Sequence, residues 1–313
     1  MSTSLKECVL VLGATGRLGR KTVQQALQQG YEVIAGGRSQ THLEEALQEM
    51  THHPNLKLEE VGLGSSDRLV AIFPKVDWVI DARNQRYDDW SHYPQMINDT
   101  LEALDKTPKP YTYVDNVYCY GRPLANPVSE DVPRQPISEK GRIRKEVEMR
   151  LLQAMSAGHT VMVARCPDFY GPGIAPFSSL ESGILTWFGD LALPHQFVHV
   201  ADAARALLAL GHDPNAYGQV WHIPGSDPIT GLNAYHLARS ISRKPIRRRV
   251  IGPRTVWLLG LINSDARGFR ETRYLWDTPM ILDGSKWTKQ YGEGWFRSHQ
   301  TAFEEMLAKF ATS

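Results

Sequence analysis

The chain has 313 residues, of which 42% are apolar and 22% charged, proportions that are ordinary for a soluble globular protein. Its formal net charge of +1 supplies no overall attraction toward nucleic acid or an anionic membrane. No apolar run approaches the roughly 18 residues that a membrane-spanning helix needs. The three cysteines form no C-x-x-C pair and are not spaced like a disulfide framework. Together with an N-terminus that lacks a secretory pattern, these features predict a cytoplasmic protein with no nucleic-acid or membrane partner.

The first half of the chain alternates short apolar runs with segments whose apolar residues recur at helical spacing. In the predicted helix over residues 41–50, Thr41 and Glu44 are placed as a capping box. Such alternation favours a parallel sheet covered by helices on both faces. Strands are predicted over 7–13, 31–37, 56–63, 76–82, 111–117 and 160–166, and helices over 17–30, 41–50, 65–74, 93–107 and after Pro136.

After Cys166 the sequence becomes rich in Gly, Pro and Ser, as expected of a loop. A strand end and helix over 198–211, a strand over 218–225 and a helix over 231–242 follow, and from about Arg254 the chain is aromatic and mostly helical. We therefore predict an α/β protein with a Rossmann-type doubly wound parallel sheet of roughly seven strands and a small C-terminal substrate-binding lobe. The nucleotide-binding core is assigned to residues 1–170, with 195–225 returning to it, and the lobe to 171–194 and 226–313.

The segment VLVLGATGRLGRK places Gly13, Gly16 and Gly19 between a predicted strand and a predicted helix. Glycines at this spacing permit a tight turn, let the backbone approach a pyrophosphate and let helix and strand pack closely. The helix start adds free amide groups and the positive end of the helix dipole. A dinucleotide cofactor is therefore expected, with an empty glycine turn as the alternative. The expected binding residues are Gly13, Thr15, Gly16, Arg17, Leu18, Gly19, Arg38, Ser39, Ala82, Arg83 and Pro167.

The end of the second predicted strand bears on which dinucleotide is bound. NAD-binding proteins usually carry Asp or Glu there, which holds the ribose 2′-hydroxyl. This strand instead ends in AGGRS, with Arg38 and Ser39 and no acid. Because a guanidinium can pair bidentately with a 2′-phosphate, we expect NADP in preference to NAD. The alternative is that Arg38 is a solvated loop residue.

Four later segments, in this order and spacing, resemble the extended short-chain dehydrogenase/reductase family, the NAD(P)-dependent epimerases and dehydratases. They read TYVDNVYCYG, VSEDVPRQP, ARCPDFYGPG and HQFVHVADAARALLAL. The resemblance covers about residues 7–240. It implies the predicted fold, a nicotinamide cofactor and a catalytic set made of Ser or Thr with Tyr-x-x-x-Lys.

The chain departs from that catalytic set at each of its three positions. Asn116 aligns with the Ser/Thr, Lys140 with the Tyr and Arg144 with the Lys. The standard hydride mechanism needs a phenol as proton donor, with a pKa lowered by a nearby cation. Arg144 can bind ribose hydroxyls but cannot release a proton at neutral pH. Lys140 could serve as an acid or base if burial or positive neighbours lowered its pKa, and otherwise it is a solvated lysine at a helix start.

Two further residues are candidates for proton transfer. Tyr118 stands where dehydratase relatives carry a catalytic acid, although it could equally be a packed tyrosine. Asp168 follows Pro167 in the loop expected beside the nicotinamide. It could be a general base or orient the carboxamide, and its alternative role is that of a turn acceptor.

Three remaining features are given structural interpretations. His195 and His199 are four residues apart in a stretch read as loop and strand, so no metal site is expected. The basic stretch from Lys244 to Val250 is interpreted as a solvated edge. The C-terminal aromatics are interpreted mostly as core, and any that line a pocket favour an apolar or aromatic substrate. They are Trp257, Phe269, Tyr274, Trp276, Trp287 and Trp295.

Our leading functional hypothesis is an NADP-dependent oxidoreductase that acts on a small, fairly apolar molecule with a non-standard catalytic set. One alternative is a non-redox isomerase, cyclase or lyase with a structural nucleotide, and another is a non-catalytic sensor of the NADPH/NADP ratio. A homodimer is also an expectation, because the family forms a four-helix interface from helices near residues 92–106 and 139–157. The second helix carries Ile143, Val147, Leu151 and Met155 at helical spacing, a pattern that would equally bury one face on the sheet.

Overall fold

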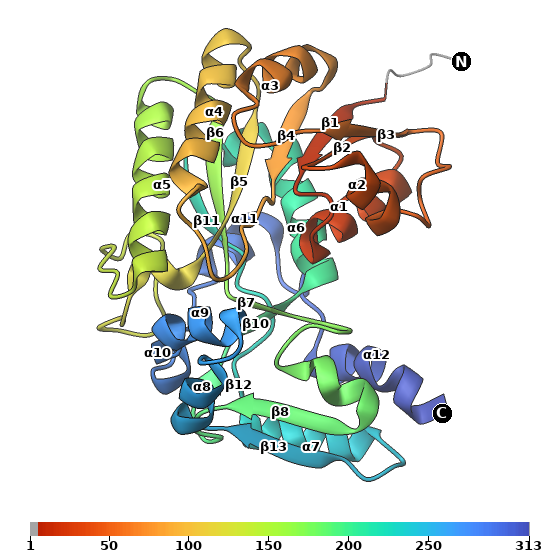
Figure 1. The fold of residues 1–313 in the computed structure, drawn as a ribbon, viewed down its shortest axis with the longest axis vertical. Coiled ribbons are helices and arrows are strands. Elements are labelled where there is room, and N and C mark those ends of the chain that lie inside the picture. Colours follow the sequence, from red (N-terminus) through yellow and green to blue (C-terminus); the bar gives the residue numbers. More distant parts are fainter. Residues whose placement is uncertain (1–5, 313) are drawn as a thin grey trace.

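The computed structural model describes residues 6–312. At its centre lies a seven-stranded sheet in the order β3-β2-β1-β4-β5-β6-β11, in which every pair is parallel (Figure 1). The predicted doubly wound sheet is therefore confirmed. The strand order reverses between β1 and β4, and open α/β sheets bind ligands at such a reversal, beyond the carboxyl ends of the strands. The strands are β1 (Cys8–Leu12), β2 (Glu32–Gly37), β3 (Leu56–Glu60), β4 (Trp78–Asp81), β5 (Tyr111–Asn116), β6 (Val161–Cys166) and β11 (Val220–His222).

Helices cover both faces of this sheet (Figure 1). The central strands are buried on both sides, which explains their nearly continuous apolar sequences. In the first helix the predicted apolar face is buried, and the helix stops before Gly30, whose φ of +91° suits glycine. One face carries α1 (Arg17–Gln28), α2 (Gln40–Ala46) and α6 (Val200–His212), and the other carries α3 (Ser66–Ile72), α4 (Tyr93–Lys106) and α5 (Glu139–Ser156).

Most of the remaining chain forms small two-stranded sheets and helices below the carboxyl edge of the main sheet, whereas α11 (Ser285–Tyr291) packs against β11 (Figure 1). The strand pairs are β7 (Asp168–Tyr170) with β10 (Phe197–His199), β9 (Pro194–His195) with β12 (Ile229–Thr230), and β8 (Ile184–Phe188) with β13 (Arg247–Ile251). The helices are α7 (Gly231–Ile241), α8 (Pro253–Leu259), α9 (Ser264–Thr272), α10 (Tyr274–Asp277), α11 (Ser285–Tyr291) and α12 (His299–Thr312). Single 3₁₀ turns are η1 (Phe73–Lys75), η2 (Val117–Tyr120), η3 (Phe177–Ser182) and η4 (Pro214–Ala216).

Two local predictions are wrong. The capping box at Thr41 and Glu44 does not form, because α2 begins one residue earlier and Ser39 caps it by accepting from the His42 amide. The segment after Cys166 is not entirely loop, because β7 and η3 lie within it. The predicted division into a core and a lobe stays a prediction, although residues 195–225 do place α6 and β11 against the main sheet. None of the described helices combines the length and the apolar character needed to cross a membrane.

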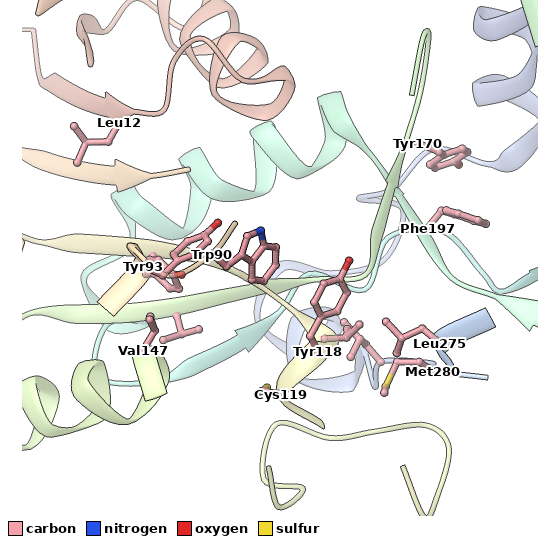
Figure 2. Packing of buried hydrophobic residues seen from close by; sticks show 14 of the residues in the cluster. Leu12, Trp90, Tyr93, Tyr118, Cys119, Val147, Tyr170, Phe197, Leu275 and Met280 are labelled. Carbon is pink, nitrogen blue, oxygen red and sulfur yellow. The ribbon is translucent and has the colours of Figure 1, made fainter. Parts of the chain in front are cut away.

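Buried aromatic side chains join the sheet to the smaller C-terminal elements. Of the C-terminal aromatics, Tyr274, Trp276 and Trp287 are buried, as predicted, whereas Trp257 is half exposed. Figure 2 shows Trp90 between Tyr93 and Tyr118 at the carboxyl edge of the sheet. The Trp90 ring is stacked on Tyr118 at 5.7 Å and meets Tyr93 edge-on at 5.1 Å. This aromatic row forms one side of the site described next.

Candidate nucleotide and substrate site

The glycine loop between β1 and α1 has the shape that a pyrophosphate requires. Gly13 has φ +77°, and a Cβ on it would lie 2.6 Å from the carbonyl oxygen of Ala82. A Cβ on Gly19 would lie 2.2 Å from the Gly13 carbonyl, so this glycine allows α1 to approach the strand. Gly16 precedes α1 without a side-chain cap, which leaves the first amides of the helix available to an anion. The loop therefore fits the dinucleotide that its sequence predicts.

A cavity of about 220 Å³ lies above the ends of β1 and β2 on the side where an adenosine would extend. Its floor is formed by the glycine loop and by Gly36 and Gly37. Gly62 also lines it. The predicted cofactor residues found here are Gly13, Thr15, Gly16, Arg38, Ala82 and Arg83.

A second hollow, open to solvent, begins where the first one ends. Thr15 and Arg38 line both, and Ser39 and His42 line the second together with Glu45. The start of α2 thus places a guanidinium, a hydroxyl and an imidazole around one space beside the adenosine cavity. Such a donor set suits a phosphate dianion, and Glu45 is the acidic member of the lining.

Arg83 is buried beside the adenosine cavity and is held by its neighbours. Its Nε donates to Asp81 at 2.9 Å, and its Nη2 donates to Thr100 at 2.6 Å. The hydroxyl of Tyr111 donates to the same Asp81 carboxylate at 2.6 Å. Desolvation by itself would raise the pKa of Asp81, but the Arg83 charge and these hydrogen bonds outweigh it and lower that pKa. The Asp81–Arg83 pair thus fixes the backbone that follows β4, where Ala82 meets the glycine loop.

A cavity of about 320 Å³ continues from the adenosine side across the ends of β4, β5 and β6. Its walls are largely apolar and aromatic, with Tyr87, Trp90 and Phe169 among them. Four of the five predicted catalytic residues line it, namely Asn116, Tyr118, Arg144 and Asp168. The predicted cofactor residues on this side are Gly16, Arg17, Leu18, Gly19, Ala82, Arg83 and Pro167.

Arg144 enters this cavity from α5 and is surrounded by aromatic rings. Its Nη2 donates to the Tyr93 hydroxyl at 2.8 Å, and its guanidinium carbon lies 4.7 Å from the centre of the Trp90 ring. Its Nη1 is 3.5 Å from Oδ1 of Asp115. Desolvation opposes the charge, but the tyrosine hydroxyls and Asp115 outweigh it and raise the pKa of Arg144, so the residue stays cationic.

Three residues that line this cavity have a buried polar atom without a hydrogen-bond partner among residues 6–312. The atoms are Nε1 of Trp90, Nε of Arg144 and Oδ1 of Asp115, and the last two are a donor and an acceptor on ion-paired side chains. An unsatisfied buried donor or acceptor costs roughly 1–3 kcal/mol. Ribose hydroxyls, which both donate and accept, would satisfy such a pair. The residues present therefore fit the nicotinamide ribose of the expected cofactor.

Lys140 does not line the cavity. Its ammonium forms an ion pair with Glu271 of α9 and lies 5.0 Å from the ring centre of Tyr87 and 5.6 Å from that of Trp90. The side chain is buried behind these two rings rather than solvated at the helix start. In this position Lys140 ties α5 to α9 and supports the aromatic wall.

Asn116 is the last residue of β5, and Tyr118 lies two residues further on, in η2. The side-chain oxygen of Asn116 accepts from the backbone amide of Tyr118 at 3.1 Å, which caps η2. The Tyr118 hydroxyl lies 3.1 Å from that of Tyr87, and the Tyr87 hydroxyl is 2.6 Å from Thr272. Burial raises the pKa of Tyr118 well above its ordinary value, so its phenol remains protonated and able to donate a hydrogen bond.

Asp168 faces the cavity from β7 and has a histidine behind it. Nε2 of His195 is 2.8 Å from Oδ2 of Asp168. The imidazole is stacked on Trp276 at 3.9 Å with an interplanar angle of 11°, and it is almost fully buried. Asp168 thus has one carboxylate oxygen on a histidine, and the carboxylate is partly exposed toward the cavity. A carboxylate backed by an imidazole is an arrangement that can take up or deliver a proton.

Several residues of this site were not among the sequence candidates. His42, Tyr87, Trp90, His195 and Glu271 come from segments interpreted as a helix, a loop or core. Tyr87 and Trp90 carried a usable signal, because two aromatics in a polar segment directly after the fourth strand lie at the reversal of strand order. No sequence signal indicated His195 or Glu271. His195 is 27 residues from its partner Asp168 in the chain, and Glu271 is 131 residues from its partner Lys140.

Comparisons with known proteins agree with this geometry. The model of the NAD dependent epimerase/dehydratase family matches residues 9–223. A dTDP-glucose 4,6-dehydratase from Bacillus anthracis, solved with NAD, superimposes with a TM-score of 0.76 at 17% identity and covers 98% of this chain and 97% of its own. A UDP-glucuronic acid 4-epimerase from Bacillus cereus, solved with UDP-glucuronic acid and NAD, superimposes with a TM-score of 0.75 at 18% identity. The superposition covers 97% of this chain and 99% of the epimerase chain.

A third similar structure comes from a different setting. The terminal R domain of the myxalamid PKS-NRPS biosynthetic pathway has a TM-score of 0.77 at 14% identity, with 99% of this chain and 92% of that domain covered. At such identities the likeness concerns the fold. None of the curated proteins searched matches the sequence.

Proposed function

This chain belongs to the NAD dependent epimerase/dehydratase family, and from that premise we propose that it is an NADP-dependent oxidoreductase acting on a small, fairly apolar molecule. The observation that carries the cofactor preference is the hollow formed by Thr15, Arg38, Ser39 and His42 next to the adenosine cavity. β2 ends in Gly36 and Gly37, so the strand end itself contributes no carboxylate that would repel a 2′-phosphate, and Glu45 is the acidic residue in the lining of the hollow.

The substrate class is inferred from the walls of the larger cavity. Tyr87, Trp90, Phe169 and Ile174 give it an apolar lining. Its charged lining residues are Arg17, Arg83, Arg144, Asp115 and Asp168. A nucleotide-sugar substrate would need donors for a diphosphate. Arg83 is engaged by Asp81 and Arg144 by Tyr93 and Asp115, and Arg17 lies beside the glycine loop, where the pyrophosphate of the cofactor itself is expected. A carbonyl compound with an apolar body suits this lining better.

Proton transfer is assigned to Asp168 with His195 as its positioning partner. A bound nicotinamide would supply the hydride to a carbonyl carbon, and the carbonyl oxygen would need one proton. Asp168 can deliver that proton and regain it from His195 through the 2.8 Å hydrogen bond. Arg144 holds the ribose, and Tyr118 offers a hydrogen bond from its neutral phenol.

The experiment has two stages. Nucleotide-free protein is titrated with NADPH and with NADH, and NADPH should bind at least about tenfold more tightly, because charged hydrogen bonds to a phosphate contribute roughly 1.5–3 kcal/mol. The protein is then incubated with NADPH and a panel of apolar aldehydes and ketones while the nicotinamide absorbance is followed. Equal affinities for NADPH and NADH would contradict the proposed cofactor preference. If no carbonyl compound caused NADPH to be oxidised, the proposed oxidoreductase activity would be wrong.

A non-redox reaction is the second candidate, and one observation favours it. The Tyr-x-x-x-Lys phenol is replaced by Lys140, which is engaged by Glu271, whereas Asp168 and His195 can move a proton without any change in the cofactor. In that case the substrate would be converted in the presence of bound nucleotide with no change in nicotinamide absorbance. Product analysis by mass spectrometry alongside the absorbance record distinguishes the two reactions.

A further inference from the structure

The hairpin of α8 and α9 presents an unusual apolar surface. Trp257, Leu258, Leu259, Leu261 and Ile262 are 51%, 58%, 41%, 56% and 85% exposed. Consecutive helical residues point in different directions around the axis, so exposure of three in a row means that the end of α8 projects from the molecule. Contiguous apolar patches of this kind on a soluble protein mark an interaction surface. We name these five residues the hairpin tip.

Arginines surround the hairpin tip. Arg254 and Arg270 line a groove together with Trp257, and the Arg270 guanidinium lies 5.8 Å from the centre of the Trp257 ring. Nε of Arg267 donates to the carbonyl of Gly260 at 3.2 Å, directly before the exposed leucine and isoleucine. Apolar side chains at the tip and cations at its base therefore occur together on one hairpin.

The segment that contains the hairpin, together with β13 and the turn before it, concentrates the positive charge of the whole chain. Residues 243–273 contain nine of the 35 lysines and arginines but only two of the 34 acidic residues, which leaves 26 basic and 32 acidic residues elsewhere. This segment thus has a net charge of +7, and the rest of the chain has a net charge of −6. The two nearly cancel, so the overall net charge of +1 does not show the asymmetry. Among these nine cations, Arg273 alone forms an ion pair with a carboxylate in the described part of the chain, with Asp277.

We propose that the α8–α9 hairpin docks on an anionic lipid surface. Trp257 and its aliphatic neighbours would enter the headgroup region, where tryptophan is favoured, and the arginines at their base would bind lipid phosphates. Figure 1 places α8 in the lower part of the molecule, away from the seven-stranded sheet, so docking leaves the nucleotide cavity clear. This replaces our expectation of no membrane partner, and it stands independently of the proposed function.

Two other occupants fit the surface less well. Symmetric pairing of two copies through the hairpin would bring the arginines of both copies together, which repels. Nucleic acid would pair with the cations but would leave the apolar tip in contact with water or phosphates. An anionic bilayer satisfies both parts, because its interface is negatively charged outside and apolar within.

The test is co-sedimentation of the full chain with vesicles, combined with tryptophan fluorescence. Vesicles of phosphatidylcholine alone are compared with vesicles containing equal amounts of phosphatidylcholine and phosphatidylglycerol. The protein should bind the anionic vesicles with a blue shift in emission and dissociate in high salt. Ile262→Ser should weaken binding about tenfold through lost apolar burial, and Arg254→Gln with Arg270→Gln should weaken it by a similar factor.

Matched controls lie outside the hairpin, in the loop after η2 and on α3. Leu124→Ser removes an apolar side chain that is 94% exposed, and Arg68→Gln removes an exposed cation, and neither should change vesicle binding. Circular dichroism of every variant checks that it is folded. Absence of binding to the anionic vesicles would overturn the proposal. Concentration-dependent dimers in analytical ultracentrifugation that Ile262→Ser dissociates would also overturn it, in favour of a second copy of the chain.

Discussion

Nε2 of His195 lies 2.8 Å from Oδ2 of Asp168, and the imidazole is stacked on Trp276. The three residues come from β7, β9 and α10, and they meet only because the small strand pairs fold back beneath the main sheet. This contact places a proton carrier beside a cavity from which the usual phenol has gone. It is therefore the relationship on which the proposed chemistry depends.

Removing either member of this pair should slow turnover. Asp168→Asn should lower kcat by at least about 10²-fold, because it removes the group that transfers the proton. His195→Gln should lower kcat by a smaller factor and change the pH profile, since glutamine keeps a hydrogen bond but does not titrate near neutral pH. NADPH affinity should stay within about twofold for His195→Gln.

The chain offers a matched control for that experiment. His159 and Asp105 form a pair with 2.9 Å between Nε2 and Oδ1 on the outside of the sheet. Asp105→Asn and His159→Gln should leave kcat and its pH profile unchanged. If the Asp168 and Asp105 variants behaved alike, the assignment of proton transfer to the cavity pair would fail.

Arg38 and His42 should control the choice between the two nicotinamide cofactors. Arg38→Ala should weaken NADPH binding about 10- to 100-fold and leave NADH nearly unchanged, because the guanidinium is expected to contact only the 2′-phosphate. His42→Ala should act in the same direction with a smaller effect, and Glu45→Gln should strengthen NADPH binding. Fluorescence titration measures both cofactors, and Arg68→Ala on α3 serves as the control. Equal losses for NADPH and NADH would contradict this role for Arg38.

Lys140 and Glu271 should be coupled in stability. Both side chains are at least partly buried, so Lys140→Met leaves the Glu271 carboxylate without its cation, and we expect a loss of about 2 kcal/mol in the free energy of unfolding. The double variant Lys140→Met with Glu271→Leu should recover part of that loss. Urea unfolding of the single and double variants measures the coupling. Additive losses would show that the ion pair does not stabilise the contact between α5 and α9.

His199 should make the protein less stable in acid. Burial, followed by the nearby Arg297 charge, lowers the pKa of His199 to about 4 from its ordinary 6.5. Because this native-state pKa is lower than that of the unfolded chain, the unfolded chain takes up the proton first as pH falls. Stability should therefore be greatest above about pH 6.5 and fall by roughly 3 kcal/mol toward pH 4.

His199→Asn isolates this contribution. Asparagine can still accept from the Ala201 amide, as the histidine does at 3.3 Å, but it does not titrate. Urea unfolding at a series of pH values should show a shallower decline below pH 6.5 for the variant than for the parent chain. Parallel declines would assign the acid sensitivity to other groups.

The sheet, the glycine loop and the family could all be predicted from the amino-acid sequence. These features rest on local patterns, namely apolar runs, helical spacing and the positions of Gly13, Gly16 and Gly19. The glycine loop tolerates little variation because the surrounding backbone leaves no room for a Cβ at Gly13 or Gly19. The sequence also identified the replaced catalytic positions, since Asn116, Lys140 and Arg144 fall at fixed distances from recognisable motifs. Four of the five candidate catalytic residues proved to line one cavity.

The contacts of those residues could be read only from the folded chain. Lys140 was interpreted as a catalytic or solvated lysine. In the folded chain it is buried, does not line the cavity and forms an ion pair with Glu271, 131 residues further along the chain. The structure also showed that Asp168 contacts His195 and that the hairpin tip is exposed. Neither could be predicted, because side-chain contacts and exposure depend on how distant segments fold together. Local patterns fix the backbone, whereas the environment of each side chain is set by segments that meet only when the chain has folded.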